Sequence, residues 1–466
     1  MATYRPTIGL EVHAELTTRT KMFCDSANNP DETRANVNVC PVCMAHPGTL
    51  PVINKEAVRH VLRVGAAVGG QLADFTEFDR KSYFYPDIPK GYQISQYIHP
   101  LVAGGDLAGV ALTRIHLEED TARSTHTKGK SLVDFNRAGV PLMELVTEPV
   151  IHDAEAAGKF ARELQLLLRT LGASQANLEK GEMRIEANIS VSNEEGRFGT
   201  KVEVKNLNSF RSVERAIDFE IKRQTALIES GGKVSQETRG WDESKQETFH
   251  QRFKEGSADY RYFPDPDLPK LHLSEIPELA LETLRASLPK LPWERRAEYQ
   301  VKGIAADHIE IFLSNENLGT LFDATCALQP DATTLIANYI CSDIVGSIAT
   351  LPAAQIENIK PEGLAALMRG LLEKNISSRG AKDLLVKVLT TGGEIEQVMQ
   401  QYLQQSDEGA LAKIVDAVLA KEEKAVAEYK SGKPAALQYL LGKSMKESAG
   451  AGNPEVLRKI LTEKLG

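Results

Sequence analysis

Residues 183–191, MRIEANISV, decide the fold of the first part of the chain. Apolar side chains alternate with charged or polar ones, which is the period-2 pattern of a strand with one buried face. After the turn residues SNEEGRFG, the segment KVEVK (201–205) alternates again, so a hairpin is predicted that sets its charged side chains on one shared face. That face is either solvated or functional.

A helix is predicted just before this strand. It begins after Asp153, a good N-cap residue, and ends at Gly172. Its apolar stripe consists of Phe160, Leu164, Leu167, Leu168 and Leu171. A helix packed on an antiparallel sheet indicates an α+β domain.

The pattern of apolar and polar residues changes twice further along the chain. Residues 1–292 are predicted to form one large mixed domain, 293–406 an all-α middle domain of short amphipathic helices, and 407–466 a small helical tail domain. The chain of 466 residues exceeds what one core usually serves, which agrees with several domains.

Composition narrows the class of protein. The net charge of −9 argues against a protein that coats nucleic acid through general electrostatics. The start MATYRPTIGLEVH lacks the pattern of a signal peptide, and no apolar run of about 20 residues is present, so no membrane association and a cytoplasmic location are expected.

IGLEVHAEL (8–16) has the pattern of a second strand, with Glu11, His13 and Glu15 on its polar face. The charged outer face of a sheet explains this equally well. RIHLEED (114–120) adds Glu118, Glu119 and Asp120, and GVPLMEL (139–145) places Glu144 in an otherwise apolar run. A carboxylate buried there needs an ion-pair partner or a metal, and converging carboxylates and imidazole suit Mg²⁺ or Mn²⁺.

Three other segments are candidate sites. DRKSYFYPDIPKGYQISQ (79–96) is predicted to be an irregular loop rich in hydrogen-bonding groups, either lining a binding site or packed on the surface. Cys24, Cys40 and Cys43, with His46 or Asp25 as a fourth ligand, form either a zinc site or a set of reduced thiols.

The third segment is the tail. From Lys424 to the end, the chain has eight Lys and Arg but only four Asp and Glu. The tail is therefore basic in a chain that is acidic overall, as contact with phosphates requires. Solvated helix faces carrying lysines are the alternative. The expected contacts are Lys430, Lys433, Lys443 and Lys446.

No P-loop, dinucleotide fingerprint or nucleophile motif occurs in the sequence, so any nucleotide chemistry must use another kind of site.

Several motifs together resemble, in order and spacing, the B subunit family of the tRNA-dependent amidotransferases. They are IGLEVHAEL, DRKSYFYPDIPKGYQISQ, HLEEDTARSTH, DFNRAGVPLMELVTEP, RIEANIS, KVEVKNLNSF, EGSADYRYFPDPDLP and, in the tail, YKSGKPAALQYLLGKSMKESAGAGNPEVL.

The resemblance implies an enzyme that works in a heterotrimer. An amidase A subunit releases ammonia from glutamine, a small C subunit holds the assembly, and the B subunit uses ATP and Mg²⁺. Glu-tRNA(Gln) or Asp-tRNA(Asn) would be phosphorylated on its side-chain carboxylate and then amidated. The basic tail would bind the tRNA.

The resemblance also implies site residues. Glu11, His13, Glu119 and Glu144 would hold magnesium, with Glu118 beside them, and Lys81 would lie where ammonia enters. The hairpin face would line the same cradle with Arg184, Glu186, Asn188 and Lys205, and the nucleotide would contact Tyr83, Tyr85, Asn206 and Asn208.

Two positions depart from the family pattern. Relatives often carry CxC before CPxC, whereas Cys24 is followed here by Asp25 and Ser26, which removes one zinc ligand. Glu186 stands where relatives often carry Asp, so the carboxylate is kept with one more methylene.

Two rival functions remain open on the sequence. One is a non-catalytic scaffold that presents aminoacyl-tRNA to other enzymes. The other is a free-standing ATP-dependent ligase that amidates a small carboxylic acid and turns over without tRNA.

Overall fold

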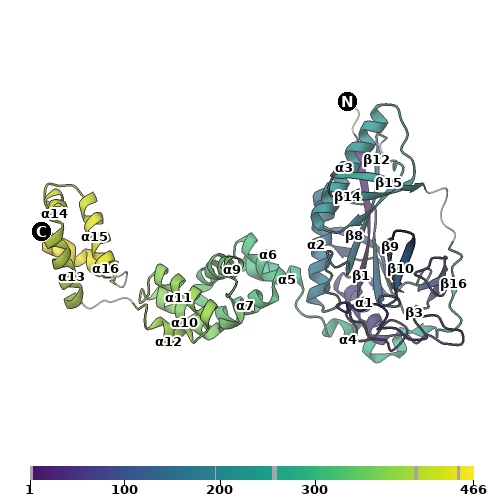
Figure 1. Cartoon of the computed structure of the whole chain (residues 1–466), viewed down its shortest axis with the longest axis horizontal. Coiled ribbons are helices and arrows are strands. Elements are labelled where there is room, and N and C mark those ends of the chain that lie inside the picture. The colour runs from purple at the N-terminus through teal and green to yellow at the C-terminus, as the bar shows by residue number, and fades with distance from the viewer. Residues whose placement is uncertain (1–3, 195, 254–259, 404–407, 449–451) are drawn as a thin grey trace. The chain divides into compact units, whose positions relative to one another are not determined.

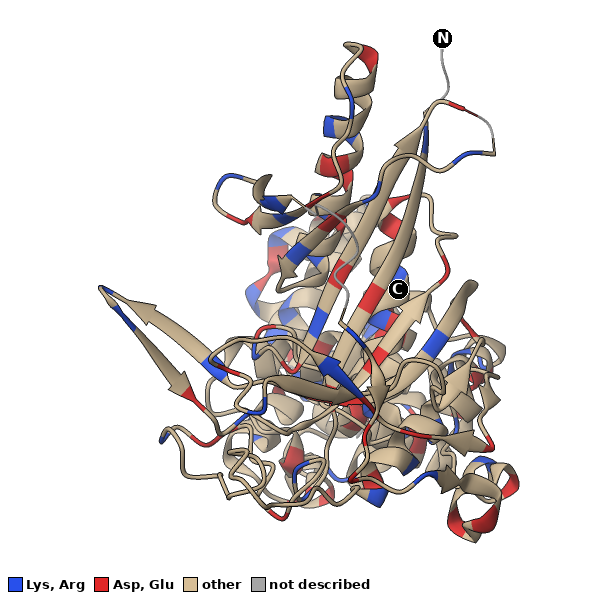
Figure 2. Cartoon of the chain, turned by 90° about the vertical axis from the view of Figure 1, so that its right-hand side faces the viewer, with Lys and Arg blue, Asp and Glu red and all other residues tan. Residues whose placement is uncertain are grey.

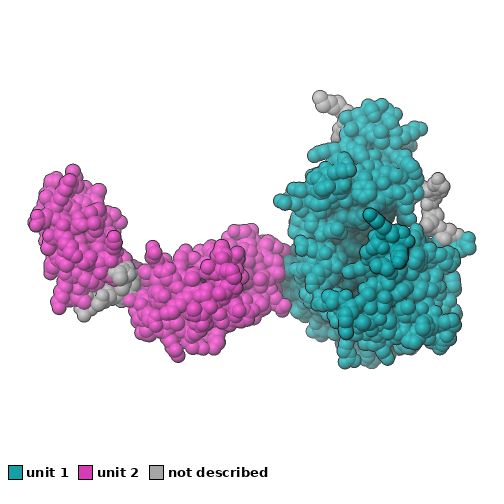
Figure 3. All heavy atoms as spheres, viewed as in Figure 1, with its two compact units in different colours: residues 1–292 teal, residues 293–466 magenta. Residues whose placement is uncertain are grey.

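The computed structural model describes residues 4–194, 196–253, 260–403, 408–448 and 452–466. The chain divides into two compact units, Met1–Pro292 and Trp293–Gly466 (Figure 3). The predicted boundary between residues 406 and 407 lies outside the described residues.

Unit 1 is built on a ten-stranded sheet with the strand order β15-β14-β13-β12-β1-β11-β8-β6-β2, and β7 pairs with β8. All neighbouring pairs are antiparallel except β13 with β14. The strands are β1 (Arg5–Glu15), β2 (Gln71–Leu72), β6 (Val102–Ala103), β7 (Asp106–Leu107), β8 (Val110–Glu119), β11 (Pro141–Thr147), β12 (Met183–Ser192), β13 (Val202–Leu207), β14 (Glu237–Asp242) and β15 (Glu247–Phe253). The predicted α+β class and the predicted hairpin of β12 and β13 are confirmed.

Helices cover one face of this sheet (Figure 1). They are α1 (Lys55–Ala67), α2 (Ala154–Thr170) and α3 (Phe210–Glu229). As predicted, α2 begins after Asp153, whose side chain accepts the N–H of Ala156 at 2.7 Å. The chain turns away at Gly172, whose φ of +64° is in the left-handed region. The alternating apolar residues of β1 and β12 are buried on the helix side, which leaves the polar residues on the other face.

Short strands surround that polar face. The prediction that segment 79–96 is an irregular loop is wrong in part. The segment contains β4 (Asp79–Ser82) and β5 (Tyr92–Ser95), which pair antiparallel, and β16 (Phe263–Pro264) pairs with β4 on its other side. Its prolines, Pro86 and Pro89, lie in the connection between the two strands, where they break no ladder. The remaining strands of unit 1 are β3 (Phe75–Thr76), β17 (Leu271–His272), β9 (Arg123–Thr127) and β10 (Lys130–Asp134), and its last helix is α4 (Leu281–Ala286).

Unit 2 is helical throughout its described residues, as predicted for the second half of the chain. Its α-helices are α5 (Pro292–Val301, which begins at the last residue of unit 1), α6 (Ala306–Ser314), α7 (Glu316–Leu328), α8 (Thr333–Asn338), α9 (Val345–Thr350), α10 (Pro361–Leu372), α11 (Ser378–Thr391), α12 (Ile395–Met399), α13 (Glu408–Lys421), α14 (Glu423–Lys430), α15 (Ala435–Glu447) and α16 (Pro454–Leu465). The last four share a core of their own that includes Leu411, Val415, Leu440, Leu457 and Leu461.

One segment of unit 2, Pro330–Thr350, is long and apolar enough to cross a membrane by length and composition alone. Ile336, Ile340 and Ile344 recur every four residues and are fully buried. This spacing is typical of a helix that packs one face on the core of a globular unit.

Candidate active site

Three neighbouring strands bring ionisable side chains together on the face of the sheet opposite the helices. His13 on β1 lies across from Glu144 on β11, and Glu144 lies across from His116 on β8. Residues directly opposite in an antiparallel pair point to the same face, with Cβ atoms about 4.5–5.5 Å apart. Strand register alone therefore creates the row His13, Glu144, His116.

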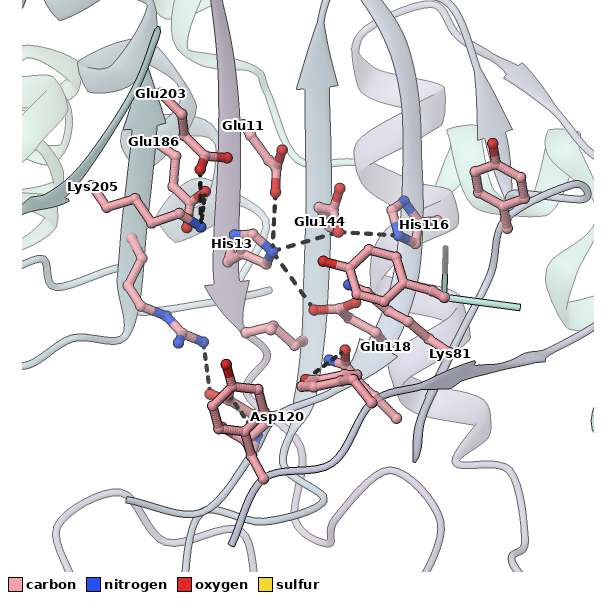
Figure 4. A pocket seen from close by; sticks show the side chains of 18 of the residues that line it. Glu11, His13, Lys81, His116, Glu118, Asp120, Glu144, Glu186, Glu203 and Lys205 are labelled. Atoms are coloured by element: carbon pink, nitrogen blue, oxygen red, sulfur yellow. Dashed lines mark hydrogen bonds and ion pairs between the residues drawn. The ribbon is translucent and has the colours of Figure 1, made fainter. Parts of the chain in front are cut away.

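Two further carboxylates flank the row because they stand two residues away on the same strands. The Nε2 atom of His13 lies 3.5 Å from Glu144 Oε2, 3.6 Å from Glu118 Oε1 and 3.8 Å from Glu11 Oε1 (Figure 4). His116 Nε2 lies 3.3 Å from the same Glu144 oxygen. Glu144 is thus the centre of the cluster, and it is only 6% exposed.

The cluster carries more negative charge than its side chains balance. Burial alone would lower the pKa of His13, yet the hydrogen bond and charge of Glu144, with the charges of Glu118 and Glu11, raise it to about 9. Burial and the charge of Glu144 raise the pKa of Glu11 to about 7. A cation placed here would relieve this repulsion.

The donor atoms fit a divalent metal ion. The ligand atoms of Glu11, His13 and Glu144 all lie within 4.8 Å of one another, and so do those of His116, Glu118 and Glu144. Carboxylate oxygens with imidazole nitrogen suit Mg²⁺ or Mn²⁺. Both triads share Glu144, so either set could hold the ion.

Glu119 does not join this cluster, and Glu118 takes the predicted place. Successive residues of β8 point to opposite faces, and Glu119 points away from the row. It accepts the N–H of Ile94 at 2.9 Å and pairs with Lys90 Nζ at 2.6 Å. The expectation that Glu119 ligates the same ion as His13 is therefore corrected.

A cavity of about 950 Å³ opens above the cluster. Of the predicted site residues, it is lined by Glu11, His13, Lys81, Tyr83, Tyr85, Glu118, Glu144, Arg184, Glu186 and Lys205. These residues come from several strands of the sheet and from β4 with the segment that follows it, so the strand arrangement assembles the cavity.

Lys81 brings a fixed positive charge to this cavity. Its ammonium lies 5.1 Å from the ring centre of Tyr260 and 5.9 Å from that of Tyr83. Burial alone would lower the pKa of Lys81, but the charges of Glu118 and Glu144 and the neighbouring Tyr262 outweigh it, and the pKa lies above its ordinary range. Lys81 is therefore an ammonium ion at neutral pH.

Three further cations are held in place by carboxylates. Arg184 on β12 donates to Asp120 Oδ2 at 2.9 Å, and Arg137 Nε lies 2.8 Å from the same oxygen. Lys205 on β13 pairs with Glu186 at 2.7 Å. Cations fixed in this way can bind phosphate oxygens without rearranging.

Besides Glu119, three more residues predicted for this site lie away from the cavity. Asn188 is two positions beyond Glu186 on β12 and lines a separate, smaller cavity beside Lys201. Asn206 and Asn208 are exposed and line neither cavity. Asn206 has a φ of +65° at an irregularity in the pairing of β12 and β13. Its prediction came from the resemblance, and alternation along the strand would itself place it on the face opposite Lys205.

The sequence prediction assigned no role to several residues that line the cavity, among them His116, Asp120, Tyr260 and Tyr262. His116 belongs to the alternating set of β8 with Glu118, so the period-2 rule applied to β1 would have found it. Asp120 follows in the same alternation, two positions after Glu118. Tyr260 and Tyr262 line the cavity from a segment far along the chain, inside the motif EGSADYRYFPDPDLP that carries part of the resemblance, but the sequence prediction assigned them no role.

The three thiols of Cys24, Cys40 and Cys43 come together, with sulfur atoms within 4.8 Å of one another. Neither His46 nor Asp25 belongs to this group. Instead, the buried ammonium of Lys21 lies 3.7 Å from Cys43 Sγ and donates to the carbonyl of Phe135 at 3.1 Å. The three thiols could hold a metal, but they form an incomplete zinc site.

The four predicted tail lysines differ in their surroundings. Lys430, Lys433 and Lys446 are exposed. Lys443 is half-buried and pairs with Glu422 at 2.7 Å. The first three are therefore the better placed to meet a phosphate.

Comparison with known proteins gives matches along nearly the whole chain. The family model described as the GatB/GatE catalytic domain matches residues 6–277, and the model described as the GatB domain matches residues 320–465.

Curated relatives cover the chain from end to end. The B subunit of the aspartyl/glutamyl-tRNA(Asn/Gln) amidotransferase from Thermus thermophilus is 43% identical over 470 residues, which is 99% of each chain. A protein of the same name from Gloeothece citriformis is 39% identical and covers 99% of this chain and 98% of its own. The B subunit of a chloroplastic/mitochondrial glutamyl-tRNA(Gln) amidotransferase from Oryza sativa subsp. japonica is 40% identical over 99% of this chain and 88% of its own. With this agreement over two family models and full-length relatives, the chain belongs to the GatB/GatE family of amidotransferase B subunits.

Proposed function

We propose that the chain is the B subunit of a glutamine-dependent aspartyl/glutamyl-tRNA amidotransferase. It uses ATP to activate the side-chain carboxylate of Glu-tRNA(Gln) or Asp-tRNA(Asn), and it then forms the amide. Family membership supports this proposal, since the relatives carry that name. The observation that carries it is the cluster of Glu11, His13, His116, Glu118 and Glu144 on the floor of a cavity edged by fixed cations.

The reaction needs such a site because a carboxylate resists attack by ammonia. Transfer of the γ-phosphoryl group of ATP to a carboxylate oxygen gives an acyl phosphate and ADP. Ammonia then attacks the acyl carbon, the C–O bond to phosphate breaks, and the amide and inorganic phosphate leave. Both steps place negative charge on phosphate oxygens, so positive charge around them lowers the barrier.

The residues of the cavity divide this work. Glu144, with His13 and Glu11 or with His116 and Glu118, would hold Mg²⁺, which neutralises phosphate oxygens when bound. Arg184 and Lys205 would meet the phosphates from the opposite wall. Lys81, as an ammonium ion at neutral pH, would orient the carboxylate and phosphate where ammonia enters.

The partners follow from the same proposal. An amidase A subunit would supply ammonia and a small C subunit would stabilise the heterotrimer. The tail would bind the tRNA through Lys430, Lys433 and Lys446, and Lys443 would make a weaker contact. A cytoplasmic location stays a prediction, since one relative is named as chloroplastic/mitochondrial.

An oxygen-isotope experiment tests the proposed reaction. The heterotrimer is given ATP, glutamine and Glu-tRNA(Gln) whose side-chain carboxylate carries ¹⁸O. We expect each amide formed to leave one ¹⁸O atom in the released phosphate, measured by mass spectrometry, because the acyl phosphate bridges through a substrate oxygen. Unlabelled phosphate would support the scaffold function, and labelled phosphate from free glutamate without tRNA would support the small-molecule ligase.

A further inference from the structure

The hairpin of β9 (Arg123–Thr127) and β10 (Lys130–Asp134) stands out from the body of unit 1 (Figure 2). Among the strands of the described residues, these two pair only with each other. All five residues of β9 and the first three of β10 are exposed. The hairpin therefore contributes little to the core, and its role must be sought on its surface.

The base of the hairpin is held firmly although its tip is free. Asn36 donates its backbone N–H to Asp134 Oδ1 at 3.0 Å and its side-chain amide to the carbonyl of Val133 at 3.3 Å. Just before β9, the N–H of Ala122 donates to the carbonyl of Asp87 at 3.0 Å. An isolated two-stranded hairpin is marginally stable in water, so these bonds fix the direction in which it projects.

The surface of the hairpin is cationic in a chain whose net charge is −9. Arg123, Lys128 and Lys130 are exposed, and none of them forms an ion pair with any residue that the structure describes. The single acid of the segment 123–134, Asp134, accepts N–H groups of Asn36 and Asn136 at the base. The blue tip and base of the hairpin are visible in Figure 2.

The other polar groups of the hairpin suit the same kind of partner. Hydroxyl groups are provided by Ser124, Thr125, Thr127 and Ser131. Guanidinium, ammonium and hydroxyl groups are the side chains that contact phosphate and sugar in nucleic acids. A lipid surface would require apolar side chains at the tip, where this hairpin carries Lys128 and Gly129.

The position of the hairpin connects it to the reaction. β9 begins three residues after Asp120, and Asp87, Asp120 and Thr121 all line the cavity. A partner that lies along the hairpin therefore reaches the rim of the cavity. An RNA whose aminoacyl end enters the cavity has its nearest phosphates at this rim.

We propose that the β9–β10 hairpin binds the phosphate backbone of the aminoacyl-tRNA and guides its end into the cavity. This inference rests on the proposed function and adds a tRNA contact in unit 1 to the one expected in the tail.

The test compares charge-removing variants in the assembled heterotrimer. The hairpin variant combines Arg123→Ala, Lys128→Ala and Lys130→Ala. The matched control, Lys159→Ala, Lys222→Ala and Lys233→Ala, removes three exposed cations on and just beyond the helices α2 and α3. A conservative variant, Arg123→Lys with Lys128→Arg and Lys130→Arg, keeps the charge.

The dissociation constant of Glu-tRNA(Gln) is measured at several salt concentrations. We expect the hairpin variant to weaken binding by about tenfold or more and to reduce the slope of log Kd against log salt by about 2 to 3, because each lost phosphate contact removes about one released counterion. KM for the tRNA should rise while kcat at saturation stays within about twofold. The control and conservative variants should match the wild type.

Three results would overturn the inference: an unchanged Kd and salt slope, an equal loss in the control variant, or failure of the hairpin variant to assemble on gel filtration, which would make the hairpin a protein interface. The wild-type heterotrimer separates this inference from the proposed function. If the wild type amidates Glu-tRNA(Gln) and the hairpin variant binds it normally, only the hairpin inference fails. If the wild type does not amidate, the proposed function fails.

Discussion

Replacing Glu144 by Gln in the assembled heterotrimer is expected to lower kcat for ATP-dependent amidation by about three orders of magnitude. Glu144 belongs to both possible metal triads, and its Oε2 faces His13 at 3.5 Å and His116 at 3.3 Å. Gln keeps the shape of the side chain and removes the charge. Without that charge the cluster would hold the proposed Mg²⁺ weakly, and the phosphoryl group would lose its main electrostatic partner.

The measurement is the initial rate of amidation at saturating ATP, glutamine and Glu-tRNA(Gln). The matched control is Glu155→Gln, which removes an exposed carboxylate in the first turn of α2. Glutamine hydrolysis by the A subunit shows that the assembly is intact. A Glu144→Gln rate within about threefold of the wild type would refute the assignment of this residue.

Replacing Asp120 by Ala is expected to destabilise unit 1 by about 3 kcal/mol, since it leaves Arg137 and Arg184 without their shared carboxylate. Asp120 is only 4% exposed. The change should also lower amidation, because Arg184 loses the bond that aims it into the cavity. Differential scanning calorimetry measures the first effect, with Asp106→Ala on the exposed edge strand β7 as control.

The same ion pairs predict the pH dependence of this stabilisation. Burial alone would raise the pKa of Asp120, but the charges of Arg184 and Arg137 outweigh it and hold the pKa below the ordinary value of 3.8. A lowered pKa contributes stability above the unfolded value and loses it as the pH falls towards the folded value. The destabilisation by Asp120→Ala should thus be full at pH 7 and should shrink below about pH 4. If Asp120→Ala lowered the free energy of unfolding by the same amount at pH 7 and below about pH 4, this explanation would be contradicted.

The core of the site could be predicted because it depends on local alternation. In IGLEVHAEL the apolar residues set the face of the strand, and Glu11 and His13 follow from it. Glu144 was found because a carboxylate inside an apolar strand needs a partner.

The assignment of Glu119 did not use the alternation of its own strand, which sets His116 and Glu118 on one face and Glu119 on the other. A contact distant in sequence stabilises this placement. Glu119 can point away from the cavity because Lys90, 29 positions earlier, neutralises it there. Asn206 was expected in the cavity from the resemblance alone, whereas alternation from Lys205 places it on the other face of the strand. The burial of Lys21 beside the thiols could not be predicted either, because it depends on a hydrogen bond to the carbonyl of Phe135, which is distant in sequence.

The central claim is that the cluster around Glu144 binds a divalent metal ion. The most direct measurement is the anomalous difference map of heterotrimer crystals soaked in Mn²⁺, which has the ligand preferences of Mg²⁺ and a measurable anomalous signal. We predict a peak in the cavity bonded to Glu144 and to His13 or His116, about 2.0–2.3 Å from their ligand atoms. A saturated crystal with manganese elsewhere and none at Glu144 would contradict the claim.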